Sequence, residues 1–374
     1  MTKGLWQGLV GAWALTVAGV GESSATEPVR LGVAGLTHTH VHWIFESAKR
    51  RDDFEIVGIA ESDPALAERY AAQHGFDLSL VYDDLDTMLA ETRPDGVTAF
   101  GTIRDHLAVV QAAAPRGIHV MVEKPLAVSL EQAQAMAELA QAHDIHLLTN
   151  YETSWYASHH EAVERVRAGE IGTLRKAVFH HGHAGPVALD INSEFLDWLI
   201  DPHWNGAGAL TDFGCYGANL AVWMTDGRRP RAVTAVTQQL QPEHYPLVDD
   251  EATIVIAWDD MQAIVQASWN WPRSRKDMAL YGTRGQFLAP DGARLTALPA
   301  DGETGADDAE RSLPVPALAA PEDDPFSWFS AVIRGDLEPA PWSPGALDNN
   351  LLVMEILQSA MDSAARGETV VLEP

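Results

Sequence analysis

The chain has little cysteine and little positive charge. Its 374 residues contain one cysteine, Cys215, so an intrachain disulfide and a thiolate metal cluster are both excluded. Lysine and arginine number 25 against 53 aspartates and glutamates, which gives a formal net charge of −28 at pH 7. A surface this acidic repels phosphate backbones and anionic lipid, so we expect no nucleic-acid partner and, after processing, no membrane association. We interpret the charge as an aid to solubility or an adaptation to salt.

Long apolar runs are also absent, except near the start of the chain. Lys3 is followed by an apolar stretch, Leu5 to Val20, and then by small residues at 23–25. This stretch is short for a membrane span, and an uncleaved anchor is the alternative. The sequence therefore predicts a cleaved signal over residues 1–25 and an exported, periplasmic protein.

Over residues 29–150, short apolar runs alternate with helical stretches. Runs that end near Gly35, Glu61 and Glu123 are each followed by a segment with helical spacing. This alternation is typical of a parallel sheet with helices on both faces. We therefore predict an α/β fold with a Rossmann dinucleotide-binding domain over 29–150.

From residue 151 the pattern is different. Strand-like runs follow one another without helices between them, at 232–239, 252–258, 262–271 and 277–281. Strands without crossovers favour an antiparallel sheet. Residues 151–374 are therefore expected to form an α+β substrate-binding and oligomerisation domain with a large, mainly antiparallel open sheet.

Three further segments of this second domain carry expectations. Residues 208–224 have an apolar helical face and are predicted to be one helix. The segment 290–325 is rich in Asp, Pro, Gly and Ala and is expected to be a mobile loop. A helix at about 346–365 is expected to pack back on the first domain.

The turn after the first strand departs from the usual dinucleotide-binding pattern. A G-x-G-x-x-G turn has three glycines, whereas Gly35 is here followed by Thr37 and His40 at the other two positions. Gly35 still permits the tight turn, and the amides of the following helix can bind a pyrophosphate. We assign Thr37, His38 and Thr39 to the cofactor site together with Gly35.

Three histidines, His38, His40 and His42, raise the question of a metal site at this turn. Alternate residues near a helix start converge poorly on one ion, and no carboxylate lies among them in the sequence. We therefore expect no metal ion.

An acidic residue, Glu61, follows the second apolar run. It stands where a carboxylate takes the adenosine ribose hydroxyls in dinucleotide-binding domains. Since a carboxylate repels a 2′-phosphate, NAD is favoured over NADP. The alternative is a solvated loop glutamate.

Several motifs occur in a fixed order along the chain. They are Asp95-Gly96-Val97, His106, Gly117-Ile118-His119-Val120, Val122-Glu123-Lys124-Pro125-Leu126-Ala127, Gly169-Glu170-Ile171-Gly172, Gly208 to Tyr216, Gly227 to Pro230 and Ser359-Ala360. Their order and spacing resemble the family of glucose–fructose oxidoreductase and inositol dehydrogenase (Gfo/Idh/MocA), over nearly the whole chain after the signal. The resemblance implies an oxidoreductase that moves a hydride between a nicotinamide cofactor and a secondary hydroxyl of a sugar, cyclitol or glycoside.

The resemblance also implies catalytic roles for Lys124, Tyr216 and Asp212. In the family, the lysine of Glu-Lys-Pro lies beside the nicotinamide and the reacting hydroxyl, where an ammonium stabilises an alkoxide. Tyr216 stands where many relatives have an acid/base histidine, and it can relay a proton if a nearby lysine lowers its pKa. Asp212 is four residues earlier on the same side of the expected helix, where it would orient substrate hydroxyls. The bond before Pro125 is commonly cis in the family.

Further binding residues follow from the same resemblance. His106, Glu123, Lys124 and Asn150 are implied at the cofactor. The basic residue that usually follows the asparagine is missing here, so we predict a pocket of imidazole, amide and indole groups that suit a polyhydroxylated ligand. These groups are His180, His183, Trp204 and Asn205, with Trp269 or Trp271 as further candidates.

Three functions are compatible with these residues. The first is hydride transfer with an NAD that stays bound, because free NAD is scarce outside the cytoplasm. The second is glycoside cleavage by transient oxidation and elimination. The third is a non-catalytic sugar-binding relative, against which the presence of both Lys124 and Tyr216 argues. The second-domain sheet is of the type that relatives use for self-association, so a homodimer or homotetramer is expected.

Overall fold

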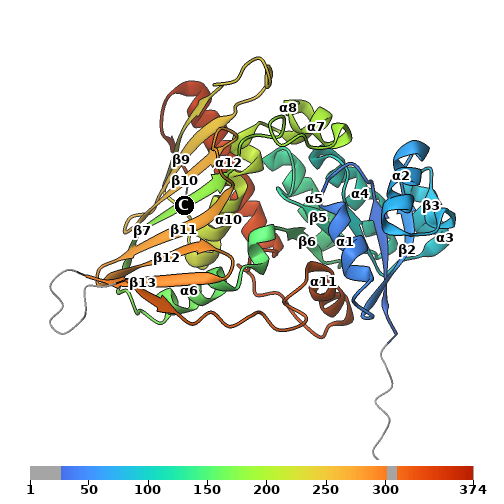
Figure 1. Ribbon diagram of the computed structural model, residues 1–374, viewed down its shortest axis with the longest axis horizontal. Coiled ribbons are helices and arrows are strands. Elements are labelled where there is room, and N and C mark those ends of the chain that lie inside the picture. Colours follow the sequence, from blue (N-terminus) through green and yellow to red (C-terminus); the bar gives the residue numbers. More distant parts are fainter. Residues whose placement is uncertain (1–26, 301–309, 374) are drawn as a thin grey trace, which may run out of the picture.

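The computed structural model describes residues 27–300 and 310–373, and its first domain is a six-stranded parallel sheet with helices on both faces (Figure 1). In spatial order the strands are β3 (Val81–Tyr82), β2 (Phe54–Ala60), β1 (Val29–Ala34), β4 (Gly96–Ala99), β5 (His119–Glu123) and β6 (Leu147–Asn150). The α-helices are α1 (Val41–Ala48), α2 (Pro64–His74), α3 (Leu85–Thr92), α4 (His106–Ala113) and α5 (Leu130–Ala142). Short 3₁₀ helices are η1 (Leu78–Leu80), η2 (Ile103–Asp105), η3 (Ala114–Arg116) and η4 (Glu152–Trp155).

The strand order places a crevice at the carboxyl ends of β1 and β4. The chain moves outward from β1 to β2 and β3, and then returns to the other side of β1 for β4, β5 and β6. In sheets of this kind, ligands bind outside the carboxyl ends of the strands at the point where the order reverses. The predicted Rossmann fold is confirmed.

Local signals in the sequence account for several helix ends. Asp63 accepts the backbone N–H of Ala65 at the start of α2, and Gly75 ends that helix with a φ of 82°. Ser129 caps α5 by accepting the N–H of Gln132 at 3.2 Å. Side chains that satisfy the free amides of a first turn stabilise a helix by about 1 kcal/mol each.

The second domain contains a nine-stranded sheet. In spatial order its strands are β14 (Arg311–Leu313), β13 (Arg294–Pro299), β12 (Gly285–Asp291), β11 (Arg275–Gly282), β7 (Leu174–Gly182), β10 (Gln262–Ser268), β9 (Glu251–Ala257), β8 (Ala232–Gln238) and β15 (Val370–Val371). The pair β7–β10 is parallel and the other pairs of this sheet are antiparallel. The mainly antiparallel sheet that the sequence predicts is therefore confirmed.

Helices of the second domain lie mostly between its sheet and the first domain (Figure 1). They are α6 (Ala157–Arg167), α7 (Ser193–Leu199), α8 (Pro202–Asn205), α9 (Ala209–Asp212), α10 (Gly214–Met224), α11 (Pro325–Arg334) and α12 (Leu347–Arg366). The helix α12 contacts both β8 of its own sheet and α5 of the first domain, while α11 contacts β1 and β2. The end of the chain thus packs against both domains.

Two expectations from the sequence need correction. The segment 290–325 is not simply a loop, because it supplies the end of β12 and the strands β13 and β14. An Asp-Gly turn joins β12 to β13, where the Asp291 side chain accepts the N–H groups of Ala293 and Arg294. Residues 208–224 are two helices, because the chain leaves the helical path at Phe213 between α9 and α10.

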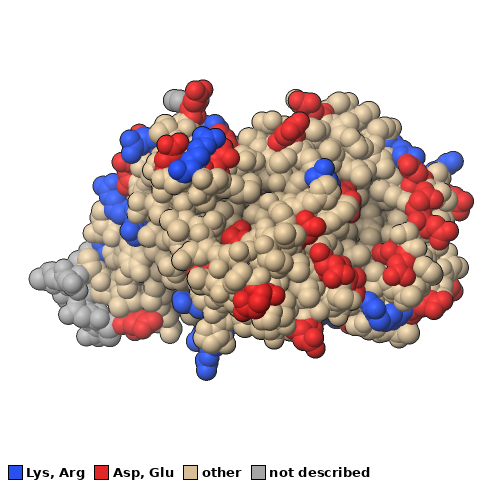
Figure 2. Space-filling model, turned by 90° about the horizontal axis from the view of Figure 1, so that it is seen from above, with Lys and Arg blue, Asp and Glu red and all other residues tan. Residues whose placement is uncertain are grey.

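Acidic side chains are spread over the face of the molecule shown in Figure 2, with fewer basic ones among them. Within residues 27–300 and 310–373, no helix is long and apolar enough to cross a membrane. The expected export signal over residues 1–25 lies outside the described residues and stays a prediction.

Candidate active site

A buried ion pair joins the two domains at the carboxyl edge of the parallel sheet. Lys124, directly after β5, donates from Nζ to Asp212 Oδ1 at 2.5 Å and to the Asp212 carbonyl oxygen at 3.2 Å. The second carboxylate oxygen of Asp212 accepts from Trp269 Nε1 at 2.9 Å. The Lys124–Pro125 peptide bond is cis. Each partner of this pair is thus held by at least two hydrogen bonds.

The two charges of this pair stabilise one another. Burial by itself would raise the pKa of Asp212, but the ammonium of Lys124 outweighs it and lowers that pKa to about 2. Burial would likewise lower the pKa of Lys124, but the charge and hydrogen bond of Asp212, with contributions from Cys215 and Glu123, together outweigh burial, so the pKa of Lys124 is raised. At neutral pH the site therefore holds an ammonium and a carboxylate.

Tyr216 lies in the first turns of α10, with two ammonium groups near its ring. The ring centroid is 5.3 Å from Nζ of Lys124 and 4.7 Å from Nζ of Lys276. Burial raises the pKa of Tyr216 well above its usual value, and the Glu152 carboxylate raises it further. The sequence-based expectation of a lowered pKa is corrected, since loss of hydration disfavours the phenolate. The phenol keeps its proton at neutral pH.

A second ion pair, Lys276 with Glu152, was not found from the sequence. Lys276 in β11 stands opposite His181 in β7 and donates to the Glu152 carboxylate, which also accepts from the Tyr156 hydroxyl at 2.5 Å. Burial would raise the pKa of Glu152, but Lys276 outweighs it, so the pKa is lowered. Lys276 thus brings a second positive charge to the ring of Tyr216.

A signal for Lys276 is present in the sequence. Side chains in a strand alternate between the two faces of the sheet, and Lys276 shares its face with the buried residues Met278 and Leu280. A charged residue in that register points inward and needs a partner.

The turn after β1 retains the features that a dinucleotide needs. Gly35 has a φ of +81°, and a Cβ there would lie 2.9 Å from the backbone of Gly101. The hydroxyl oxygen of Thr37 is buried with no hydrogen-bond partner among the described residues. A phosphate oxygen would satisfy this hydroxyl, so the turn fits the pyrophosphate of a nicotinamide dinucleotide. Thr39, partly buried, accepts the N–H of His42 through its carbonyl oxygen at 3.3 Å.

Glu61 braces this turn from the end of β2. Its two carboxylate oxygens accept the backbone N–H groups of Leu36 and Asp63, both at 2.9 Å. The residue is nine per cent exposed, so it is not the solvated loop glutamate that was the alternative. Its role toward a ribose stays a prediction.

The carboxylate of Glu123, at the end of β5, meets the histidines of the turn. Nδ1 of His40 lies 2.8 Å from Glu123 Oε2, and Asn150 Nδ2 donates to Glu123 Oε1 at 2.7 Å. His42 turns away and pairs with His74 at 2.7 Å. The tertiary structure therefore supplies the carboxylate that the sequence lacks near His38 and His40.

The turn is covered by a segment of the second domain. Phe195 and Trp198 of α7 pack on the His38 ring, with centroid distances of 4.7 and 5.7 Å. Glu194 of the same helix binds Arg69 and the Tyr70 hydroxyl of α2, at 2.5 and 2.9 Å. The two domains thus close over the carboxyl edge of β1.

His106 is buried in the same region. Its Nδ1 bonds to the Leu126 carbonyl oxygen at 3.0 Å, while Nε2 has no partner among the described residues. Burial lowers the pKa of His106 to about 4, so the ring is neutral at pH 7. His106 lies behind the Glu-Lys-Pro segment and supports it.

Of the substrate residues expected from the sequence, the structure brings His183 to the ion pair. Its ring lies edge-on to Phe213 at 4.7 Å. Burial lowers the pKa of His183, and the charge of Asp212 opposes that shift. The imidazole is therefore neutral and within electrostatic reach of Asp212 and Lys124.

The assignments of His180 and Asn205 are corrected. His180 bonds to Asp277 at 2.9 Å on the outer face of β7, because its neighbours Phe179 and His181 take the inner face. Asn205 is fully buried and donates its amide to the carbonyl oxygens of Leu199 and Ala207.

Of the three candidate tryptophans, Trp204, Trp269 and Trp271, one lies at the ion pair. Trp204 lies edge-on to His203 in α8, at 4.6 Å, beside η2 of the first domain. Trp271 lies under Arg275 and near His180, toward the outer face of the sheet. Trp269, bonded to Asp212, is the tryptophan that reaches the ion pair.

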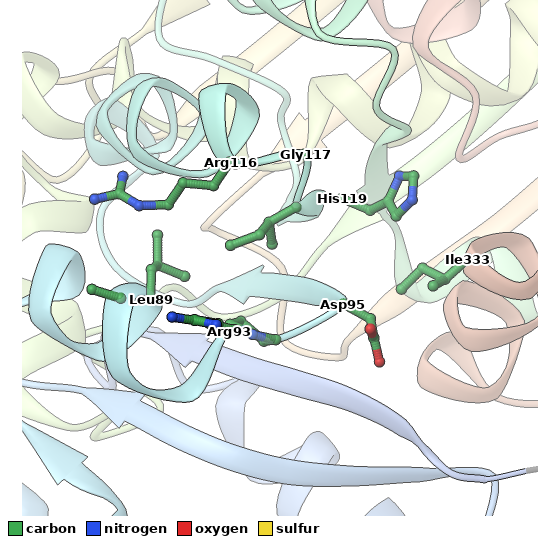
Figure 3. A pocket seen from close by; sticks show the side chains of 10 residues that line it. Leu89, Arg93, Asp95, Arg116, Gly117, His119 and Ile333 are labelled. Carbon is green, nitrogen blue, oxygen red and sulfur yellow. The ribbon is translucent and has the colours of Figure 1, made fainter.

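A cavity of about 650 Å³ lies at the opposite edge of the parallel sheet (Figure 3). Arg93, Asp95, Arg116 and His119 line it, and these residues precede or begin β4 and β5. Ligands of doubly wound sheets bind at the carboxyl ends of the strands. The region around Lys124, and not this cavity, is therefore the candidate active site.

Comparison with known families identifies the family of this chain. The model of an oxidoreductase family with an NAD-binding Rossmann fold, GFO/IDH/MocA, matches residues 29–151. The model of the GFO/IDH/MocA C-terminal domain matches residues 159–288. Together the matches cover more than half of the chain, which therefore belongs to the GFO/IDH/MocA family of oxidoreductases.

Three distant relatives align over almost the whole chain. The NADP(+)-linked D-xylose 1-dehydrogenase of Haloarcula marismortui is 23% identical over 360 residues, covering 94% of this chain and 96% of its own. An aldose-aldose oxidoreductase from Caulobacter crescentus has the same fold, with a TM-score of 0.76, 22% identity, and coverage of 92% of this chain and 100% of its own. An inositol dehydrogenase homolog from Azotobacter vinelandii, solved with NAD+, has a TM-score of 0.77 and 22% identity. The match covers 92% of this chain and 98% of that chain.

Proposed function

We propose that this protein transfers a hydride between NAD and a secondary hydroxyl of a sugar, cyclitol or glycoside, with Lys124 at the reacting oxygen. The observation that carries the proposal is the buried Lys124–Asp212 pair beside Tyr216, at the carboxyl edge where this fold binds dinucleotides. Bound NAD supplies the nicotinamide ring that accepts or returns the hydride. Relatives named as xylose dehydrogenase and inositol dehydrogenase homolog support a sugar-like substrate.

The residues of this chain handle the oxygen and its proton. When the alcohol is oxidised, the C–H electron pair leaves as hydride, the hydroxyl proton passes to the phenolate form of Tyr216, and a C=O bond forms. This phenolate is a minor form at neutral pH, because burial raises the pKa of Tyr216. The Lys124 ammonium stabilises the negative charge that develops on oxygen, and Asp212 with Trp269 keeps that ammonium in place. In the reverse direction the protonated phenol of Tyr216 is the proton donor to the alkoxide.

The cofactor preference rests on Glu61. A buried carboxylate at the end of β2 opposes the charge of a 2′-phosphate, which favours NAD over NADP. Removing this charge in Glu61→Gln should reduce the ratio of NAD to NADP affinity. An unchanged ratio in nucleotide titrations would remove the support for NAD.

Retention of the nucleotide is supported by the cover that α7 forms over the turn. Glu194, Phe195 and Trp198 contact residues on both sides of the expected pyrophosphate position. Protein purified without added nucleotide should therefore show the absorbance and fluorescence of bound nicotinamide. Nucleotide-free protein would argue against retention, and nucleotide binding itself would then be tested by titration.

Self-association is proposed through the outer face of the large sheet. This face, at the left of Figure 1, carries no helix among the described residues, and Val178, Val236, Val255 and Ile264 point toward it. A dimer or tetramer in light scattering that dissociates in Val236→Lys would support this. Export to the periplasm is proposed from the first 25 residues alone, and fractionation of cells would test it.

The test of the main proposal is a screen of sugars, cyclitols and glycosides for reduction of NAD at 340 nm. Lys124→Met should abolish the activity, whereas Lys49→Met, a surface lysine paired with Glu46, should retain it. Release of an aglycone without net reduction would redirect the assignment to glycoside cleavage. Equal activity in Lys124→Met and Lys49→Met would overturn the proposal.

A further inference from the structure

Two histidines of the turn after β1, of which His40 stands at a glycine position of the usual pattern, come together with a carboxylate from another strand. The nitrogen atoms of His38 and His40 and a carboxylate oxygen of Glu123 all lie within 4.8 Å of one another. His38 and Glu123 are buried, and His40 is partly buried. The two histidines follow β1 and the glutamate ends β5, so the group stands at the carboxyl edge of the sheet.

From this grouping we infer that His38, His40 and Glu123 form a binding site for one divalent transition-metal ion, with zinc as the best match. Zinc takes imidazole nitrogen and carboxylate oxygen at about 2.0–2.2 Å, and two histidines with one glutamate are a ligand set of zinc sites that keep an open position. Tetrahedral ligands at such bond lengths are about 3.4 Å apart. The observed separations run from 2.8 Å for His40–Glu123 up to the 4.8 Å limit, so pairs of ligand atoms must move by up to about 1.4 Å relative to one another.

The surroundings hold two of the three ligands, Glu123 and His40, in place. Asn150 donates to the second oxygen of Glu123 and is itself fixed by Trp155. The ring of His40 stacks on Trp43 with centroids 3.8 Å apart. Outer hydrogen bonds and packing of this kind fix ligand orientation in metal sites.

Two exchanges accompany binding. The ion takes the place of the proton that His40 Nδ1 and Glu123 Oε2 now share at 2.8 Å. If His38 binds through Nε2, its Nδ1 becomes protonated and gives up the contact from the His40 backbone N–H at 3.1 Å. The nearby ammonium of Lys124 is already neutralised by Asp212, which limits its repulsion of a cation.

This site gives the unusual turn a physical explanation. A side chain at the third glycine position would crowd the helix against the strand, but the His40 side chain points to Glu123 and away from that contact. The remaining positions on the ion are left for water or an oxygen of a ligand in the crevice.

The experiment uses full-length protein from which metal has been removed with a chelator, without nucleotide or substrate. Zinc is titrated in competition with an indicator dye, and cobalt(II) is titrated as a coloured probe. We expect one equivalent of zinc per chain and visible cobalt absorption bands. His38→Ala, His40→Ala and Glu123→Gln should each weaken zinc binding by about 100-fold or more.

His42→Ala is the matched control. His42 lies in the same turn, but its Nδ1 pairs with His74, so the variant should bind zinc within about twofold of the native protein. Circular dichroism and thermal unfolding identify any variant that is misfolded. If a histidine variant is misfolded, the zinc affinity of Glu123→Gln tests the ligand set, because this variant keeps an oxygen that accepts from Asn150. Absence of stoichiometric zinc in the native protein, or an equal loss in His42→Ala, would overturn the site. Neither result depends on the hydride-transfer proposal.

Discussion

Two lysine–carboxylate pairs flank the ring of Tyr216, and they differ in depth and in origin. Lys124 and Asp212 have side chains that are 7% and 8% exposed, whereas Lys276 and Glu152 are 20% and 30% exposed. The first pair joins the Rossmann domain to a helix of the second domain, and the second joins the large sheet to η4. The deeper pair contains the lysine of the Glu-Lys-Pro motif, whereas Lys276 of the shallower pair lies on β11 and belongs to no such motif.

The difference in burial leads us to expect different roles for the two pairs. A deeply buried ammonium interacts strongly with a developing negative charge, because little water screens it. A half-buried ammonium is better suited to hold a substrate hydroxyl or a neighbouring oxygen. The pairs should therefore separate in their effects on turnover, stability and substrate affinity.

The largest effect is expected from Lys124→Met. Loss of the ammonium at the reacting oxygen should lower kcat/KM by about 1,000-fold, or roughly 4 kcal/mol of transition-state stabilisation. Steady-state kinetics with the best sugar from the screen would measure it, with Lys49→Met as the control. A loss of less than about tenfold would mean that the deep pair is structural only.

The two ion pairs should also differ in how much each contributes to the free energy of unfolding. Asp212→Asn leaves a buried ammonium without its carboxylate and should lower the free energy of unfolding by about 3 kcal/mol. Glu152→Gln removes a partner from a half-buried lysine and should lower it by about 1 kcal/mol. Urea denaturation of both variants gives the comparison, and equal losses would contradict the difference in depth.

Low pH should weaken the Lys124–Asp212 pair within a defined pH range. The folded-state pKa of Asp212 is about 2, below its ordinary value of 3.8, so its stabilising contribution is complete above pH 4 and is lost as pH falls toward 2. The loss should amount to about 2 kcal/mol. Unfolding free energies of the native protein and of Asp212→Asn should converge across this window; a constant gap would show that Asp212 does not titrate as assigned.

The smaller of the two effects on catalysis is expected from Lys276→Met. Loss of this cation should raise KM about tenfold, which is roughly 1.4 kcal/mol of binding free energy, with a smaller change in kcat. The reason is that the ammonium is expected to bind the substrate equally well in the ground state and in the transition state. Lys176→Met is the control, since Lys176 stands on the opposite face of the same sheet. A change confined to kcat would instead place Lys276 at the reacting atoms.

Much of the fold was predictable because it depends on local signals. Alternating apolar runs and helical stretches predicted the parallel sheet, and strands without crossovers predicted the antiparallel one. The strands β13 and β14 were missed, since the surrounding Asp, Gly and Pro residues hid a short Asp-Gly hairpin. The break at Phe213 was missed as well, because no proline or turn residue at 213 marks it.

In the candidate site, residues selected from sequence motifs were predicted better than residues selected by chemical type. Lys124, Asp212 and Tyr216 were selected from motifs, and the structure brings them together. His180 and Asn205 were selected by chemical type alone, and the structure directs the first to the wrong face and commits the second to backbone carbonyls. Residue type without register or partner is therefore a poor guide to a pocket.

The sequence by itself determined the family, the two sheets and the lysine on which the proposed chemistry depends. These properties follow from short-range patterns, in which neighbouring residues specify strands, turns and motifs. Only the tertiary structure decided which charges meet. It paired Lys276 with Glu152 across 124 positions, raised the pKa of Tyr216 by burial and brought Glu123 to the histidines of the turn. Such contacts depend on the packing of distant segments, which no local pattern encodes.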